Sequence, residues 1–194
     1  ELVAIDDANG NNAIHYKKVK GDPTALTSSD QRKGLILGKD ITILENVGGN
    51  GDYASVAEYK DLLTATALAG SLTGFTKVKD LVSALKAETA EGAGSKIKGK
   101  DVEASDAILL ADHTTLTVGE HKVKSLSYSS VKDSASNLAS DLDGGAGLAT
   151  GKAVIIDASK GTATLTEINK ILAVGKAASA SYDLVTALAE DLAS

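Results

Sequence analysis

The sequence predicts a mixed α/β repeat protein, an elongated array of short, mostly parallel strands interleaved with short helices. Three observations favour this class: an aliphatic composition, a recurring aromatic-led segment, and short runs of β-branched residues. Of the 194 residues, 43% are hydrophobic, yet there are one Phe, five Tyr, and neither Trp nor Met. A core of Leu, Ile, Val and Ala suits thin, closely packed layers, in which each unit covers only its neighbours.

Charge and cysteine content exclude several classes of protein. The formal net charge is −6 and the only arginine is Arg32, whereas nucleic-acid binders need a basic face with arginines for bidentate contacts. The absence of Cys excludes a disulfide scaffold, Cys-ligated metal and thiol chemistry. Lacking Met as well favours an extracellular protein. The sequence contains no apolar run of 18 residues, the length that would predict a membrane span. The start at Glu1 suggests a fragment or a processed protein.

One segment recurs three times along the chain. Each copy opens with an aromatic residue, which is followed by Val three positions later and by Leu ten positions later, and the aromatics lie 53 and 54 residues apart. The apolar positions recur at i, i+3, i+4 and i+7, which predicts an amphipathic helix led by the aromatic residue. The three predicted helices are Phe75–Ala87, Tyr128–Ser140 and Tyr182–Ser194.

A second recurring element is a short apolar run that predicts a strand buried on both faces. The predicted strands are Ile41–Glu45, Ala107–Leu110 and Ala153–Ile156. A Ser- or Thr-led segment follows each strand. Ser55 with Glu58, and Thr164 with Glu167, have the capping-box spacing that starts a helix. The middle copy differs, because Thr115–Glu120 alternates like a strand.

These patterns divide the chain in two. Residues 1–34 predict an N-terminal strand or cap region, with an alternating strand at Ala13–Val19 and a turn at Gly21–Pro23. Residues 35–194 predict about three degenerate strand-helix repeats. Residues 88–106 are rich in Gly, Lys and Glu, which predicts a solvated loop inserted in one repeat.

The motif Tyr128-Ser-Ser-Val-Lys-Asp-Ser-Ala-Ser-Asn-Leu-Ala resembles a repeat of large bacterial surface proteins, close to Y-S-[LIV]-x-D-[ST]-A-x-N-[LI]. The likeness continues through Gly144–Ser159 and Thr162–Leu172 and covers about 60 residues. Proteins with such repeats include S-layer-like proteins and adhesins exported by type I secretion. The resemblance implies an extracellular structural or adhesive role and identifies no catalytic residue. Two departures are Ala187 at the position of Asp133 and Phe75 in place of Tyr.

Three groups of oxygen-bearing side chains are candidate calcium ligands. The first group surrounds Gly10, the second lies in the sequence GGNGD, which partly resembles a calcium-binding nonapeptide, and the third precedes Gly144. An alternative for each is an Asx-type turn, because Asp, Asn and Gly tolerate unusual backbone angles. The candidate ligands are Asp6, Asp7, Asn9 and Asn11, then Asp52, then Asp141 and Asp143.

No pattern for catalysis is complete. Gly144–Ala153 looks like a phosphate-binding loop, but Ala146 replaces its first glycine and Ala153 its Ser or Thr. The three histidines, His15, His113 and His121, belong to no HExxH motif and are predicted to be exposed strand or turn residues. No G-x-S-x-G elbow is present. We therefore expect a protein that is not an enzyme, although a hydrolase domain stays open as a third alternative.

Together these features lead us to expect a structural segment of a secreted or cell-surface bacterial protein, either a surface layer, a filament or an adhesin. It would act by self-association, or with neighbouring domains of the same chain. The alternative is a binding module for surface polysaccharide or another protein, with Ca²⁺ ordering its loops.

Overall fold

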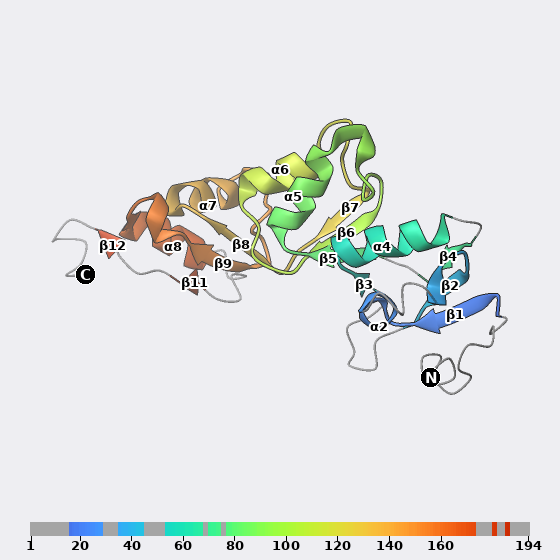
Figure 1. Ribbon diagram of the computed structural model, residues 1–194. Helices are drawn as coiled ribbons and strands as arrows, with labels where there is room; N and C mark the ends of the chain where they lie inside the picture. Colours follow the sequence, from blue (N-terminus) through green and yellow to red (C-terminus); the bar gives the residue numbers. More distant parts are fainter. Residues whose placement is uncertain are drawn as a thin grey trace. The chain divides into compact units, whose positions relative to one another are not determined.

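The computed structural model describes residues 16–28, 35–44, 53–67, 70–74, 77–173, 180–181 and 185–186. The chain divides into two compact units, Glu1–Lys79 and Asp80–Ser194. Within the described residues there are six α-helices, and the strands are short and pair in parallel (Figure 1). The predicted mixed α/β class with short parallel strands is confirmed.

The N-terminal unit contains a three-stranded parallel sheet of order β1-β2-β4. In this sheet Ile41 of the central strand lies opposite Val19 and Leu72. A second parallel pair joins β3 to β5 and places Ala54 opposite Val78. The strands are β1 (Lys18–Gly21), β2 (Asp40–Ile43), β3 (Tyr53–Ala54), β4 (Leu72–Thr73) and β5 (Lys77–Asp80), and the helices are α2 (Pro23–Thr27) and α4 (Val56–Thr66).

Local sequence explains both helices of this unit. The predicted capping box starts α4: the Ser55 hydroxyl accepts from the Glu58 amide, and the Glu58 carboxylate accepts from the Ser55 amide. The turn predicted at Gly21–Pro23 is wrong, because Gly21 ends β1 and Asp22 caps α2. Pro23 occupies the first helical position, where its fixed φ suits the helix and its missing N–H costs nothing. The core of the unit is formed by Val19, Leu26, Ile36, Ile41, Ile43, Leu62 and Ala65.

The C-terminal unit contains further parallel pairs: β6 with β7, β8 with β9, β11 with β9, and β10 with β12. A single bridge places Ile108 opposite Val131 of β8. Within this unit the helices lie along one side of the strands (Figure 1). The strands are β6 (Asp101–Ala104), β7 (Ser125–Ser127), β8 (Ser130–Asp133), β9 (Ala153–Ile156), β10 (Ala163–Thr164), β11 (Ala180–Ser181) and β12 (Val185–Thr186), and the helices are α5 (Val82–Ala90), α6 (Leu110–Thr117), α7 (Ala135–Leu142) and α8 (Leu165–Ala173).

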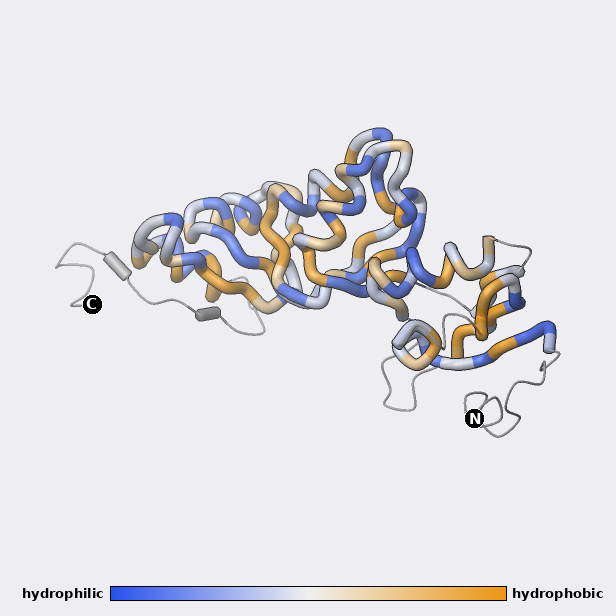
Figure 2. Tube along the Cα trace, in the orientation of Figure 1, coloured by the Kyte–Doolittle hydropathy of each residue, from blue (hydrophilic) through white to orange (hydrophobic). Residues whose placement is uncertain are grey.

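The core of this unit alternates along each strand. The burial pattern of β9 places Val154 and Ile156 inside and Ala153 and Ile155 in partly exposed positions. Figure 2 shows the strand as a largely hydrophobic stretch. Fully buried aliphatic side chains from successive strands and helices complete the core, which fits the thin layers expected from the composition. These side chains include Leu85, Ile97, Val102, Ile108, Leu116, Val131, Leu138 and Ile171.

The prediction that the residues directly after each aromatic residue are helical is wrong for the first two copies. Val78 and Val131 lie in strands β5 and β8, and the helices that follow begin at Val82 and Ala135. A Val and a Leu seven residues apart fit one helix face, but they also fit a strand residue and a helix residue that meet in one core. The third predicted helix, Tyr182–Ser194, lies outside the described residues except for β12.

The middle of the chain brings further corrections. The loop predicted at 88–106 contains the end of α5 and strand β6, whose Val102 is completely buried. The strand predicted at Ala107–Leu110 is reduced to the bridge at Ile108, and α6 begins at Leu110. The strand pattern at Thr115–Glu120 is wrong as well, because Leu116 is a core residue of α6. The strand predicted at Ala153–Ile156 is confirmed with the same bounds.

Among the described residues, no helix is both long enough and apolar enough to cross a membrane.

Candidate functional site

The Tyr128 side chain is the centre of a polar cluster in the C-terminal unit. Its hydroxyl donates to the Leu148 carbonyl at 3.0 Å. The Lys152 ammonium lies 4.6 Å from the ring centroid and also donates to the Tyr128 carbonyl at 3.0 Å. The His113 ring packs edge-on against the Tyr128 ring at 5.7 Å between centroids. Burial raises the pKa of Tyr128 and lowers the pKa of His113. The cluster therefore holds the loop that follows α7 against the segment that leads into β8.

The N-terminal unit holds the same arrangement around Tyr16. The Tyr16 hydroxyl donates to the Leu35 carbonyl, and the Lys39 ammonium lies 4.7 Å from the ring centroid. The lysine follows its tyrosine by 23 residues here and by 24 residues in the C-terminal unit. A cation over the face of an aromatic ring is attracted by the ring quadrupole, so each pair holds a turn against a strand.

Three turns of one kind precede strands β2, β6 and β9. In each, a Gly-Lys pair follows a buried Ile or Ala, and the lysine amide donates back to that residue's carbonyl at 3.0–3.2 Å. The glycines Gly38, Gly99 and Gly151 have φ of 66°, 66° and 73°, a left-handed conformation that disfavours any other residue. The turns therefore share a backbone geometry as well as a sequence pattern.

Asp133, at the end of β8, joins segments that lie far apart in the sequence. Its carboxylate accepts from the Ser134 amide at 2.8 Å, from the Asn137 side chain at 3.0 Å and from the Lys160 ammonium at 3.0 Å. It also accepts from the Leu110 amide at the start of α6, at 3.3 Å. The Asp133 side chain is only 3% exposed. Burial alone would raise the pKa of Asp133, but the hydrogen bonds, led by that from Lys160, hold it below its ordinary value.

The carboxylates of Asp80, at the end of β5, and of Asp106, after β6, have similar partners. Asp80 accepts from the Leu81 amide at 2.8 Å, as Asp133 does from the Ser134 amide. Asp106 accepts from the Val82 amide at the start of α5 at 2.8 Å. Carboxylates at helix N-termini satisfy amides that have no partner within the helix, so these groups set where each helix begins.

Buried carboxylates near the ends of α5 and α7 form another equivalent pair. Glu88 accepts from the Lys96 amide at 2.6 Å, and Asp141 accepts from the Ala149 amide at 2.9 Å. In both cases the amide lies eight residues after the carboxylate. Glu88 is 2% exposed and Asp141 is 8% exposed. Each carboxylate closes the loop that leads from a helix to a Gly-Lys turn.

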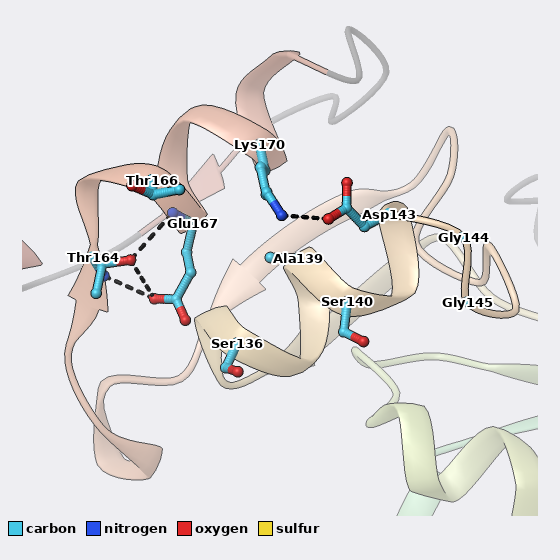
Figure 3. Close-up of a pocket in the computed structure, with 10 residues that line it drawn as sticks. All are labelled: Ser136, Ala139, Ser140, Asp143, Gly144, Gly145, Thr164, Thr166, Glu167 and Lys170. Carbon is cyan, nitrogen blue, oxygen red and sulfur yellow. Dashed lines mark hydrogen bonds and ion pairs between the residues drawn. The ribbon is translucent and has the colours of Figure 1, made fainter.

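Polar contacts also join the helices in pairs. Thr24 of α2 donates to Glu58 of α4 at 2.7 Å. Lys86 of α5 pairs with Asp112 of α6 at 2.5 Å. Asp143 at the end of α7 pairs with Lys170 of α8 (Figure 3).

An open groove of about 590 Å³ lies between α7 and α8. The Asp143–Lys170 ion pair spans one part of it, and the Thr164–Glu167 capping box, confirmed here, lies at another (Figure 3). The remaining lining is small or hydroxyl-bearing: Ser136, Ala139, Ser140, Gly144, Gly145 and Thr166. Such a surface offers hydrogen bonds to a polar ligand.

The candidate calcium ligands are only partly placed. Asp6, Asp7, Asn9, Asn11 and Asp52 lie outside the described residues. Asp141 and Asp143 lie near the end of α7, where one holds the Ala149 amide and the other pairs with Lys170. In the part of the chain that the structure describes, no three His, Asp or Glu side chains are grouped to hold a metal ion.

The histidines and the glycine-rich loop are also placed. His113 lies on α6 and is partly buried, so the predicted strand or turn location is wrong for it, while His121 lies in a turn. His15 is outside the described residues. In Gly144–Ala153, the ammonium of Lys152 is held at Tyr128, and the segment leads into β9.

Sequence reasoning missed the Tyr16 cluster and the Gly-Lys turns. The signal was present: Tyr16 precedes Val19 by three residues and Leu26 by ten, as Tyr128 precedes Val131 and Leu138. The sequences GAGSKIKGKDV and GAGLATGKAV, which begin at Gly92 and Gly145, also align with a one-residue difference in length. Sequence patterns alone predict an inserted loop for the first of these segments and suggest a phosphate-binding loop for the second.

Comparison of this chain with protein-family models, with curated proteins and with solved structures gives no match.

Proposed function

We propose that this chain is a structural segment of a secreted or cell-surface bacterial protein. It is an elongated array of equivalent units and acts through self-assembly in a surface layer, a filament or an adhesin. The proposal rests on a correspondence between strand pairings along the chain, described in the next paragraphs.

Each proposed copy begins at an aromatic residue and contains four strand positions and two helices. The first helices are α2, α5 and α7, and the second helices are α4, α6 and α8. The first strand position is occupied by β1, β5, β8 and β12, and the second by β2, β6 and β9. The third position is occupied by β3, the Ile108 bridge and β10, and the fourth by β4, β7 and β11. The copies begin at Tyr16, Phe75, Tyr128 and, for a partial fourth copy, Tyr182.

The observation that carries the proposal is that strand positions pair by one scheme. The second strand pairs with the fourth in all three copies: β2–β4, β6–β7 and β9–β11. The third strand pairs with the first strand of the next copy: β3–β5, Ile108–β8 and β10–β12. The first strand pairs with the second in β1–β2 and β8–β9. Each copy thus offers its neighbour an open strand, which suits a stacked array.

The polar side chains follow the same scheme. Asp40, at the start of one second strand, accepts from the Ser71 hydroxyl at 2.8 Å, and Asp101, at the start of another, accepts from the Ser125 hydroxyl at 2.6 Å. The Tyr–Lys clusters, the Gly-Lys turns and the buried carboxylates also recur at equivalent positions. These recurring residues therefore hold each copy together internally, and within the described residues none of them gathers into a reactive constellation.

The extracellular location is supported by composition and by the resemblance of the Tyr128 segment. A chain without Cys needs no oxidation after export, and its core of small aliphatic residues suits a stack of thin units.

Two measurements test the proposal. Small-angle scattering on the chain should give a radius of gyration well above the roughly 16 Å of a compact globule of this length. Negative-stain microscopy of the secreted parent protein should show lattices or filaments. A compact scattering curve, together with particles that stay separate at every concentration, would contradict the proposal.

The groove between α7 and α8 favours a second candidate, a binding module for surface carbohydrate. Hydroxyl groups and an ion pair line the groove, and such groups can hydrogen-bond a sugar. Ca²⁺ at the predicted ligands would then order neighbouring loops. Titration of polysaccharides by calorimetry, with and without EGTA, tests this candidate. Binding by soluble monomers would favour it over self-assembly, and no heat with any glycan would count against it.

A further inference from the structure

We propose that two molecules of this chain join head to tail, with β1 of one molecule taking the place of β12 on β10 of the other. This inference rests on the proposed self-assembly and names its contact. The occupant is a second copy of the chain, and the docking element is the first strand of its first proposed copy.

In each pairing of this type among the described residues, the third strand of a copy accepts the same kind of strand. In β3–β5, the Ile108–β8 bridge and β10–β12, the third strand of one copy receives the first strand of the next. The register pairs Ala54 with Val78, Ile108 with Val131, and Ala163 with Val185. A first strand with Val three residues after an aromatic residue therefore fits this position.

β1 has the features of that strand. Val19 follows Tyr16 by three residues and is 3% exposed, and Leu26 follows ten residues after Tyr16, as Leu192 follows Tyr182. Within the described residues, β1 pairs with β2 and occupies the end of its sheet. Its other edge corresponds to the edge that β5 presents to β3 and that β8 presents to Ile108.

Exchange would break few of the strand pairings found among the described residues. β10 and β12 share two registered residue pairs, whereas β8 and β9 share four. Replacing an internal strand by the equivalent strand of another molecule is domain swapping, and a head-to-tail contact of this kind grows into an open chain of molecules. The register predicts Ala163 opposite Val19 and Thr164 opposite Lys20 in the joined pair.

Disulfide trapping tests the predicted register, because the chain contains no Cys. Lys20 and Thr164 are both exposed, and neighbouring parallel residues lie about 4.8 Å apart, within the range that a disulfide can span. One chain carries Lys20→Cys and an isotope label, and the other carries Thr164→Cys. After mixing and mild oxidation, mass spectrometry measures the labelled–unlabelled disulfide. Control mixtures replace either variant with Lys98→Cys, an exposed turn residue.

We expect the Lys20→Cys and Thr164→Cys mixture to give at least a fivefold higher yield of the mixed disulfide than either control mixture. A peptide of residues 182–194 should suppress that yield, and a scrambled peptide should not. Yields equal to the controls would overturn the head-to-tail contact. Sedimentation of the same mixtures separates the two failures: association without the disulfide leaves self-assembly standing, whereas monomers at every concentration contradict both.

Discussion

The Lys152 ammonium lies 4.6 Å from the centre of the Tyr128 ring, and the two residues are 24 positions apart in the chain. Lys39 and Tyr16 have the same relationship in the other unit. In both places the tyrosine hydroxyl donates to the carbonyl of a leucine that lies four residues before the lysine. Tyr16 and Tyr128 therefore each hold the segment that leads into a strand against the turn that precedes the next strand.

Removing the two tyrosine hydroxyls should have equal effects. Tyr16→Phe and Tyr128→Phe each lose one hydrogen bond and keep the ring, so each should lower the free energy of unfolding by about 1 kcal/mol. Urea unfolding followed by circular dichroism measures this. A cost at one position and none at the other would argue against equivalent clusters.

The Asp133 carboxylate should matter more than an exposed one. Asp133→Asn leaves Lys160 and two backbone amides with weaker partners, and we expect a loss of about 2 kcal/mol in the free energy of unfolding. Asp143→Asn is the matched control, because its ion pair with Lys170 is exposed at 57% and 44%. Its loss should stay below about 1 kcal/mol. Equal losses would show that Asp133 does not join the helices.

The Gly-Lys turns should share a backbone penalty. An added Cβ at Gly99 or Gly151 meets no atom within 4 Å, so an alanine there is strained only by its positive φ. Gly99→Ala and Gly151→Ala should each cost about 1 kcal/mol. Gly94→Ala is the control, since Gly94 is not among the positive-φ glycines and the added Cβ would lie 4.0 Å from Glu91. A neutral result at Gly99 or Gly151 would contradict the shared geometry.

Acidification should weaken the His113 environment. Burial lowers the pKa of His113 below 6.5 in the folded chain, although the Asp141 charge opposes this. The unfolded chain therefore binds the proton first. The stabilising contribution is complete above pH 6.5 and is lost as the pH falls through the folded pKa. His113→Gln should flatten the decline in urea midpoint between pH 7.5 and 5. The same slope in wild type and His113→Gln would refute the effect.

Sequence patterns were informative where one local rule decided the structure. The capping boxes at Ser55 and Thr164 and the strand at Ala153–Ile156 are confirmed because hydroxyl spacing and β-branched runs act over a few residues. The residues Val78 and Leu85 were misassigned to one helix because a strand-to-helix junction preserves their spacing.

The polar cluster was harder to predict. Tyr16 escaped notice because Gly21, Asp22 and Pro23 interrupt the similarity to the Tyr128 segment. The role of Lys152 depends on a contact with a residue 24 positions earlier, which no local pattern contains. Glu88 lies in a segment whose Gly and Lys content is typical of solvated loops, yet its side chain is buried.

Deleting one whole proposed copy tests the central claim most directly. A chain without residues 75–127 joins Gly74 to Tyr128, so that β3 meets β8 in place of β5 and each remaining strand position keeps its kind of partner. If the copies are equivalent, this chain should retain the far-UV circular dichroism per residue of the parent and unfold cooperatively in urea, with a lower midpoint. A disordered spectrum or a loss of cooperative unfolding would contradict a stack of interchangeable units.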